Sequence, residues 1–116
     1  MINIATFKKI ALSFAETNEQ PHFEKTSFRV GKKIFATYDS KNNRACNKLS
    51  IADQDIFCLY DKSIIFPVHN KWGKQGWTFI HLSKIKKQLF TDALTLAYGE
   101  VAPKKLTNLI KSEEKK

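Results

Sequence analysis

The spacing of the apolar residues changes after Pro21, and this change limits the folds that are open to the chain. From Ile4 to Phe14, apolar residues recur every three or four positions, which predicts an amphipathic helix over residues 3–16. The segment TNEQP that follows has the composition of a helix-terminating turn. From residue 26 the apolar residues alternate in twos, which is the period of a β-strand. The chain therefore combines helix and strand within a short sequence.

The segment TSFRVGKKIFATY predicts two strands joined by a tight turn at Gly31 and Lys32. Phe28 and Val30 share one face of the first strand, and the polar residues between them share the other. The segment DSKNN has the composition of a turn, and RACNKLS after it predicts a third strand. Antiparallel strands joined by short turns in this way form a meander.

The second half of the chain predicts a helix, two strands and two further helices. Ser50 stands where the N-cap of a short helix is expected, and the segments SIIFPV and GWTFIHL then predict strands. Trp77 is expected in the core, because its strand carries apolar residues on both faces. Ser83 is the predicted N-cap of the longest helix, residues 84–101, and Pro103 suits the first turn of the last helix. The expected order, α-βββ-α-ββ-α-α, describes an α+β fold, an antiparallel sheet with its helices packed mainly on one face.

The length of 116 residues suits a single domain, residues 1–116, in which residues 110–116 are expected to form a frayed tail. The first residues lack the pattern of a secretion signal, and no apolar run is long enough to cross a membrane. Cys46 and Cys58 are too few for a disulfide scaffold and show no CxxC spacing. We therefore expect a cytoplasmic protein with reduced thiols and no membrane partner. The oligomeric state is left open by the sequence, with a monomer favoured.

Positive charge is the most unusual part of the composition. Twenty Lys and Arg residues oppose eleven Asp and Glu residues, so 20 − 11 leaves a net charge of +9, with a pI near 9.6. An excess of this size attracts polyanions such as nucleic acid, although lysines also serve solubility alone. Arg29 and Arg44 are the only arginines in the sequence, which favours contact with a phosphate backbone over the reading of bases.

Two loops combine lysines with glycine. One is the turn at Gly31 with Lys32 and Lys33, and the other is the segment KWGK at residues 71–74. Protruding β-loops of this kind can contact a duplex, where lysines neutralise phosphates and an aromatic residue stacks or wedges. The plainer alternative is that loop tips are polar because they lie in water. The expected nucleic-acid contacts, with DNA as the favoured partner, are Arg29, Lys32, Lys33, Lys71, Trp72, Lys74, Lys104 and Lys105.

Catalytic and metal-binding motifs are not found in the sequence. The three histidines are dispersed and lack the spacing of metal ligands, and the four glycines form no phosphate loop. We therefore expect a protein that is not an enzyme and that uses no cofactor and no metal. The alternative to nucleic-acid binding is a pocket for a small anion or peptide, lined by His22, Arg29, His69 and Trp72.

Trp72 precedes Gly73 and lies outside the alternation of the strand that follows. A side chain of this size either folds back onto the sheet or stays exposed for a partner. Lys71 and Lys74 are expected to be exposed in both cases.

Three blocks of the sequence, PHFEKTSFRVGKKIFATY, FPVHNKWGKQGWTFIHL and LAYGEVAPKKL, resemble the MmcQ/YjbR family in their order and spacing, over residues 4–108. The resemblance implies a fold similar to that of bacterial frataxin (CyaY-like). It also implies predicted DNA binding through two β-loops, a double wing. The matching residues are Phe28 to Gly31 and Ile34 to Ala36 in the first block, Trp72 to Lys74, Gly76 and Trp77 in the second, and Ala102 to Lys104 in the third.

Two positions depart from the family pattern. Lys32 stands where a second glycine is frequent, which stiffens the turn and adds charge. Asn70 stands where an aromatic residue is frequent, which removes a stacking ring. The frataxin-like fold also raises iron binding, which needs clustered carboxylates. The first helix carries Lys8 and Lys9, with Glu16 only at its end, so iron binding is rejected.

Overall fold

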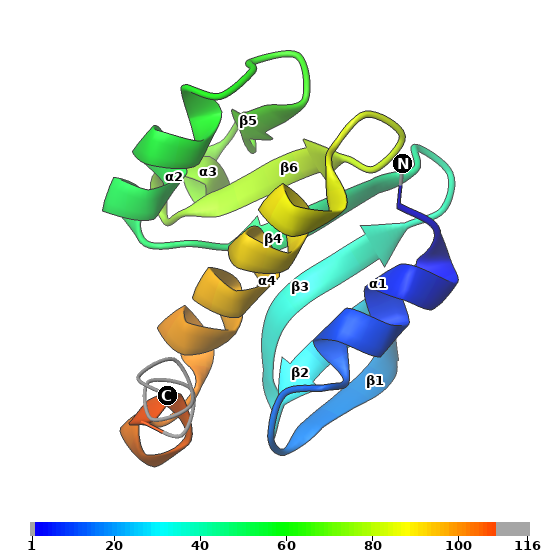
Figure 1. Ribbon diagram of the computed structural model, residues 1–116, viewed down its shortest axis with the longest axis vertical. Helices are drawn as coiled ribbons and strands as arrows, with labels where there is room; N and C mark the ends of the chain where they lie inside the picture. The colour runs from blue at the N-terminus through cyan, green and yellow to red at the C-terminus, as the bar shows by residue number, and fades with distance from the viewer. Residues whose placement is uncertain (1, 109–116) are drawn as a thin grey trace.

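The computed structural model describes residues 2–108, and its centre is one antiparallel sheet of six strands (Figure 1). The strands lie side by side in the order β1-β2-β3-β4-β6-β5. A further helical segment at residues 104–108 follows the last long helix. In chain order the elements are α1 (Ile4–Ala11), β1 (Thr17–His22), β2 (Lys25–Val30), β3 (Lys33–Asp39), β4 (Arg44–Lys48), α2 (Ile51–Cys58), β5 (Ile65–Pro67), α3 (Lys71–Lys74), β6 (Trp77–His81) and α4 (Lys87–Val101).

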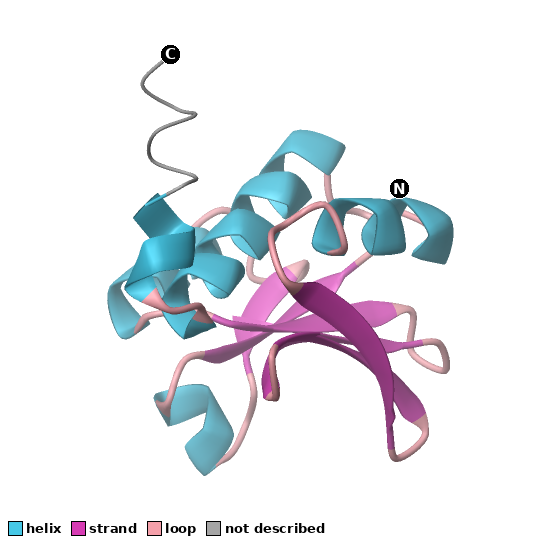
Figure 2. Ribbon diagram, turned by 90° about the horizontal axis from the view of Figure 1, so that it is seen from below, coloured by secondary structure: helices cyan, strands magenta, loops and turns pink. Residues whose placement is uncertain are grey.

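The sheet has a covered face and an open face. In Figure 2, α1 and α4 lie together on one side of the sheet, and the short helix α3 projects from the other side. The hairpin of β1 and β2 bends toward the same side as α3, so the open face is concave. The core therefore lies between the sheet and the helices α1 and α4, and the concave face lies outside it.

Aromatic side chains join these two helices to the sheet. Phe7 of α1 stacks on Phe28 of β2 with 4.8 Å between ring centres, and it meets Phe90 of α4 edge-on at 4.9 Å. Tyr98 of α4 meets Phe35 of β3 at 5.7 Å. All five rings are fully buried, and the burial of each stabilises the fold by about 1.5–3 kcal/mol.

An irregularity in β3 decides which side chains reach each face of the sheet. The register with β2 shifts between Phe28, which lies opposite Ala36, and Arg29, which lies opposite Ile34. Phe35 and Ala36 are consecutive and both fully buried, while Ile34 lines a cavity on the open face. A bulge of this kind bends the strand and increases its local twist. It therefore contributes to the concave shape and leaves an apolar side chain on the concave side.

The α+β fold class is confirmed, but the sequence prediction misses one strand. The segment TNEQP, which predicts a turn, belongs to β1, and β1 pairs with β2 from Thr17 opposite Val30 to His22 opposite Lys25. Pro21 cannot donate a backbone hydrogen bond, and an edge strand tolerates it because one of its sides has no partner strand. With β1 and α3 included, the order becomes α-ββββ-α-β-α-β-α.

The first helix is shorter than its apolar pattern predicts. α1 ends at Ala11, and residues 12–16 form turns. Phe14, the last apolar residue of the pattern, still stacks on Tyr98 with 4.8 Å between ring centres. Glu16 has a φ of 59°, a left-handed conformation that directs the chain into β1. The apolar spacing thus identifies the buried face correctly and the end of the helix wrongly.

The longest helix begins later than the sequence predicts. Ser83 is the predicted N-cap, but α4 begins at Lys87 with Lys86 as its N-cap, and no side chain caps it by a hydrogen bond. The prediction for Ser50 is confirmed, since its hydroxyl accepts a hydrogen bond from the backbone N–H of Asp53 at 3.1 Å. A serine before an apolar run therefore predicts the N-cap correctly for α2 and wrongly for α4.

The described part of the chain, residues 2–108, holds no helix with the length and apolar character needed to cross a membrane. The last predicted helix is present from residue 104, and its Leu106 is buried. The predicted tail at residues 110–116 lies outside the described residues.

Candidate binding groove on the open face of the sheet

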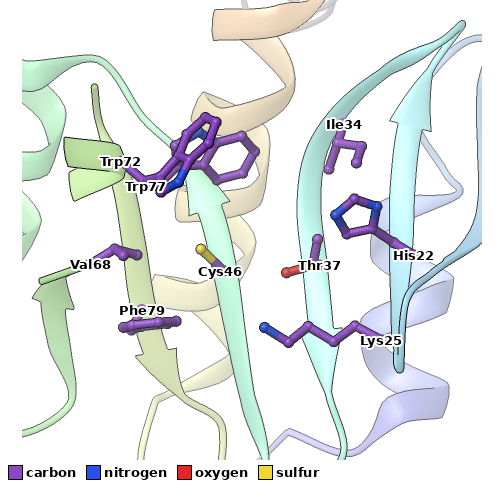
Figure 3. Close-up of a pocket in the computed structure, with 9 residues that line it drawn as sticks. All are labelled: His22, Lys25, Ile34, Thr37, Cys46, Val68, Trp72, Trp77 and Phe79. Carbon is purple, nitrogen blue, oxygen red and sulfur yellow. The ribbon is translucent and has the colours of Figure 1, made fainter. Parts of the chain in front are cut away.

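A cavity of about 400 Å³ lies on the concave face, between α3 and the hairpin of β1 and β2 (Figure 3). Strands β3, β4 and β6 form its floor, Trp72 borders one side, and His22 and Lys25 border the other. We call this cavity the open-face groove. Its lining residues are His22, Lys25, Ile34, Thr37, Cys46, Val68, Trp72, Trp77 and Phe79.

Trp77 lies on the open face, so the prediction that it completes the core is wrong. β6 alternates as its sequence predicts, but the fully buried residues are Thr78 and Ile80. Trp77 and Phe79 are half-buried and line the groove. The strand carries apolar residues on both faces, and this composition alone does not tell which face the helices cover.

The short helix α3 holds Trp72 beside the groove and is itself fixed by close backbone contacts. A Cβ atom at Gly73 would lie 1.8 Å from the carbonyl oxygen of Val68, so this approach requires glycine. The buried side chain of Gln54 donates from Nε2 to the carbonyl oxygen of Gly73 at 2.9 Å. The side chain of Asn70 caps the helix by accepting a hydrogen bond from the N–H of Trp72 at 2.9 Å. These contacts fix the backbone of α3 from both sides.

Trp72 is 49% exposed on this fixed backbone. The Nζ atom of Lys71 lies 5.8 Å from the centre of the indole ring, within the range of a cation–π contact. The ring borders the groove, so the side chain neither enters the core nor lies wholly in solvent. The sequence predicts a β-loop here, and this prediction is wrong. The cap from Asn70 and the close contact at Gly73 produce a turn of helix instead.

The opposite side of the groove is formed by the hairpin of β1 and β2. His22 and Lys25 pair at the end of these two strands. Phe23, in the turn between them, has a φ of 57° and is 93% exposed. Its ring centre lies 4.8 Å from that of His22. Lys25 is exposed and brings a positive charge to this side of the groove.

Thr37 and Cys46 contribute polar atoms to the floor of the groove. Burial raises the pKa of the Cys46 thiol to about 11, against the opposing effect of the positive charges of Lys25 and Arg44. The thiol is therefore neutral at pH 7 and a weak nucleophile. Arg44 lies over the ring of Phe79, with 3.8 Å between its Cζ atom and the ring centre. The Nε atom of the same guanidinium lies 3.7 Å from a carboxylate oxygen of Asp39, so its positive charge is paired.

The segments that carry the expected nucleic-acid contacts lie toward one end of the sheet. Lys33 begins β3, and Lys48 ends β4 opposite Trp77, where β6 begins. Antiparallel pairing therefore places the turn between β2 and β3, the end of β4, and α3 at the same end. The Nζ atom of Lys48 lies 4.0 Å from a carboxylate oxygen of Glu100, so the end of α4 lies there too. We call this the α3 end of the sheet. Its exposed lysines are Lys32, Lys33, Lys71, Lys74, Lys104 and Lys105.

The structure brings together two of the four residues expected to line a ligand pocket, since His22 and Trp72 both line the groove. Arg29 lies opposite Ile34 and shares its face of the sheet, but its Nε atom donates to the hydroxyl of Ser27 at 2.9 Å. His69 stacks on the ring of Phe66, in β5, with 5.8 Å between ring centres. Neither Arg29 nor His69 is among the described residues that line the groove.

The floor of the groove is absent from the sequence prediction. Thr37 lies opposite Cys46, and Cys46 lies opposite Phe79, so these three residues form one row across β3, β4 and β6. The signal that could have found them is strand alternation combined with strand order. Alternation alone assigns each residue to a face, and only the order β3-β4-β6 places the three faces side by side.

The three histidines pack against aromatic rings. His69 and His81 both contact the ring of Phe66, with ring centres 5.8 Å and 5.5 Å away, and His22 packs against Phe23. Within residues 2–108, no three His, Cys, Asp or Glu side chains gather closely enough to hold a metal ion.

Comparison with known proteins bears on the family and on the fold. The fold is similar to that of the crystal structure of the Deinococcus radiodurans protein DR2400, a DUF419 domain, with a TM-score of 0.78 and 19% sequence identity over 97% of this chain and 88% of that one. At this identity the likeness shows a shared fold alone. A search of curated proteins found no match. Residues 12–100 match the family model described as YjbR, and because this match covers most of the sequence, the chain belongs to the YjbR family.

Proposed function

We propose that the protein is a cytoplasmic nucleic-acid-binding module, with DNA as the favoured partner, and that the α3 end of the sheet contacts the phosphate backbone. The observation that carries this proposal is that segments distant in the sequence lie toward one end of the sheet. The turn at residues 31–33, the helix α3 and the residues after α4 all lie at this end. One phosphate backbone can therefore contact all of them.

The lysines of the α3 end are exposed and able to reach phosphates. Lys48, which is also near this end, donates from Nζ to the carbonyl oxygen of Gln75 and serves the fold instead. Each lysine that neutralises a phosphate releases bound counterions, so the affinity falls as the salt concentration rises. The arrangement differs from a double wing, because one of its two basic segments is a turn of helix.

Net charge by itself does not locate the contact surface. The opposite end of the sheet, where β6 ends at His81, is followed by Lys84, Lys86 and Lys87. These lysines are exposed as well. A general attraction between a basic protein and a polyanion would use both ends equally, and this offers a matched control for the proposal.

The test is fluorescence anisotropy of labelled DNA and RNA, titrated with the protein over a series of salt concentrations. The variant Lys71→Glu/Lys74→Glu reverses two charges at the α3 end, and Lys86→Glu/Lys87→Glu reverses two charges at the opposite end. We expect the first variant to bind at least about tenfold more weakly than the second, with the salt slope lowered by about 2. Circular dichroism confirms that both variants fold.

Two outcomes would contradict the proposal. One is the absence of binding at low salt, which would leave the charge to serve solubility. The other is an equal loss of affinity in the two variants, which would show a general attraction without a contact surface at the α3 end.

A second candidate function is the binding of a small anion or peptide in the open-face groove. It is favoured by one observation, that His22 and Trp72 line the same cavity. Titration with inorganic phosphate and with short peptides, followed by tryptophan fluorescence, tests it. A saturable change that is lost in His22→Ala supports this function, and an unchanged spectrum contradicts it.

A further inference from the structure

We infer that the open-face groove holds one unpaired base, so that the protein prefers single-stranded nucleic acid to a duplex. The inference rests on the proposed function, because it adds a base site to the phosphate contacts of the α3 end. Three features of the groove carry it: the way in which Trp72 is held, the size and lining of the groove, and the charges on its two sides.

Trp72 is exposed because of the way in which α3 is built. The contact of Gly73 with Val68 and the hydrogen bond from Gln54 fix the backbone that carries the ring. An exposed indole ring forgoes the stabilisation that its burial would give. A ring whose backbone is fixed before binding can stack on a flat partner with a smaller loss of conformational entropy. Base–aromatic stacking uses such a ring, and every base has a flat face to offer.

The size and lining of the groove suit one base. Its volume of about 400 Å³ lies in the range of sites for small organic molecules. Trp77 and Phe79 add aromatic side chains to the floor, and Arg44 lies over the ring of Phe79. The hydroxyl of Thr37 and the ring of His22 can form hydrogen bonds with the edge of a base. None of the described lining residues is acidic, so no carboxylate within the lining opposes the approach of a nucleotide.

Positive charges stand on both sides of the groove. Lys25 lies on the hairpin side, and Lys71 and Lys74 lie on the α3 side. A strand that crosses the groove therefore meets a lysine before and after the bound base. Glu24 and Asp39 lie beyond Lys25, around a second depression of the surface. Lys41 and Arg44 line the same depression, so its charges are mixed, whereas the segment of α3 carries two lysines and no acidic residue.

Single strands and duplexes differ in how readily they present a base. In a duplex the bases are paired and stacked, and turning one out of the helix costs a few kcal/mol. A single strand presents its bases without this cost. A groove for one base beside a phosphate-binding surface therefore favours the single strand.

The test compares a labelled single-stranded DNA of about 15 nucleotides with the duplex of the same sequence, by anisotropy at low salt. Trp72→Leu removes the stacking ring and keeps an apolar side chain. Tyr60→Leu is the matched control, because Tyr60 is 51% exposed and lies outside the groove lining. We expect the single strand to bind at least about tenfold more tightly than the duplex. We expect Trp72→Leu to lower the affinity for the single strand by about 5- to 100-fold and to leave the affinity for the duplex little changed. The control variant should bind both forms of DNA with little change in affinity.

The outcomes separate this inference from the proposed function. If single-stranded and duplex DNA bind equally, with salt dependence, and Trp72→Leu changes neither affinity, the base site is wrong. The phosphate contacts of the proposed function are then still supported. If neither single-stranded nor duplex DNA shows salt-dependent binding, both the base site and the proposed function are wrong. Titration with adenosine and cytidine monophosphates is the third arm. Trp72-dependent binding of these nucleotides without binding of the single strand would assign the groove to free nucleotides and overturn the inference.

Discussion

The Nε2 atom of Gln54 donates a hydrogen bond to the carbonyl oxygen of Gly73 at 2.9 Å and so links α2 to α3 inside the fold. We expect Gln54→Leu to lower the free energy of unfolding by about 0.5–1.5 kcal/mol, because a buried hydrogen bond is lost while the carbonyl oxygen of Gly73 keeps the N–H of Gly76 as a donor. Urea unfolding measures this change in the free energy of unfolding. Gln88→Leu is the control, since Gln88 is exposed and bonds only at the surface of α4. An equal loss in the two variants would contradict the role of Gln54.

Two glycines of this protein respond to alanine in opposite directions. In Gly73→Ala the new Cβ meets the carbonyl oxygen of Val68 at 1.8 Å, so α3 has to move, and we expect a loss of at least about 2 kcal/mol. At Gly99, in α4, a Cβ meets nothing within 4 Å. Gly99→Ala should therefore stabilise the protein by about 0.5–1 kcal/mol, because alanine is the better helix former. Thermal unfolding of the two variants checks both signs.

The thiol of Cys46 makes stability depend on pH in the alkaline range. Burial raises its pKa from 9.0 to about 11, so between these values the unfolded chain loses the thiol proton and the folded chain keeps it. The folded state then binds more protons, and the free energy of unfolding falls as the pH rises through this range. The contribution is fully present below pH 9.0. We expect Cys46→Ala to flatten this dependence in urea unfolding, whereas parallel curves for the two proteins would contradict the assignment.

Asn47 is fully buried between the strands, and neither polar atom of its side chain has a hydrogen-bond partner within the described part of the chain. Its strand neighbours are Ala36 and Thr78. We expect Asn47→Leu, which has the same number and branching of side-chain heavy atoms, to raise the free energy of unfolding by about 1–2 kcal/mol, because an unpaired amide is costly to bury. Calorimetry measures the change. A lower stability in Asn47→Leu would show that the amide has a partner in solution.

Local signals were enough to predict part of the fold. β2 alternates in twos up to Val30, and Gly31 after it has a φ of 61° and so suits the turn to β3. Ser50 caps α2 through a residue only three positions away. In each case the residues that decide the structure are neighbours in the sequence, and composition and spacing can therefore report them.

Distant contacts decide the elements that were missed. β1 has no apolar alternation, because it lies at the edge of the sheet and its backbone is ordered by pairing with β2. α3 depends on Gln54, which precedes Gly73 by 19 positions. The same limit applies to the groove. The sequence singles out His22 and Trp72, but the row of Thr37, Cys46 and Phe79 exists only in the assembled sheet.

Both edges of the sheet are poor templates for a further strand. β1 carries Pro21 and the charged Glu19, which pairs with Lys8 at 3.2 Å, and β5 has three residues and ends at Pro67. Proline removes a backbone donor, and a short strand offers few groups for pairing. A partner that binds the sheet therefore meets side chains of the concave face, since it cannot readily add a strand at an edge. The protein can therefore expose aromatic rings on its sheet while the edges of this sheet resist pairing with strands of a second molecule.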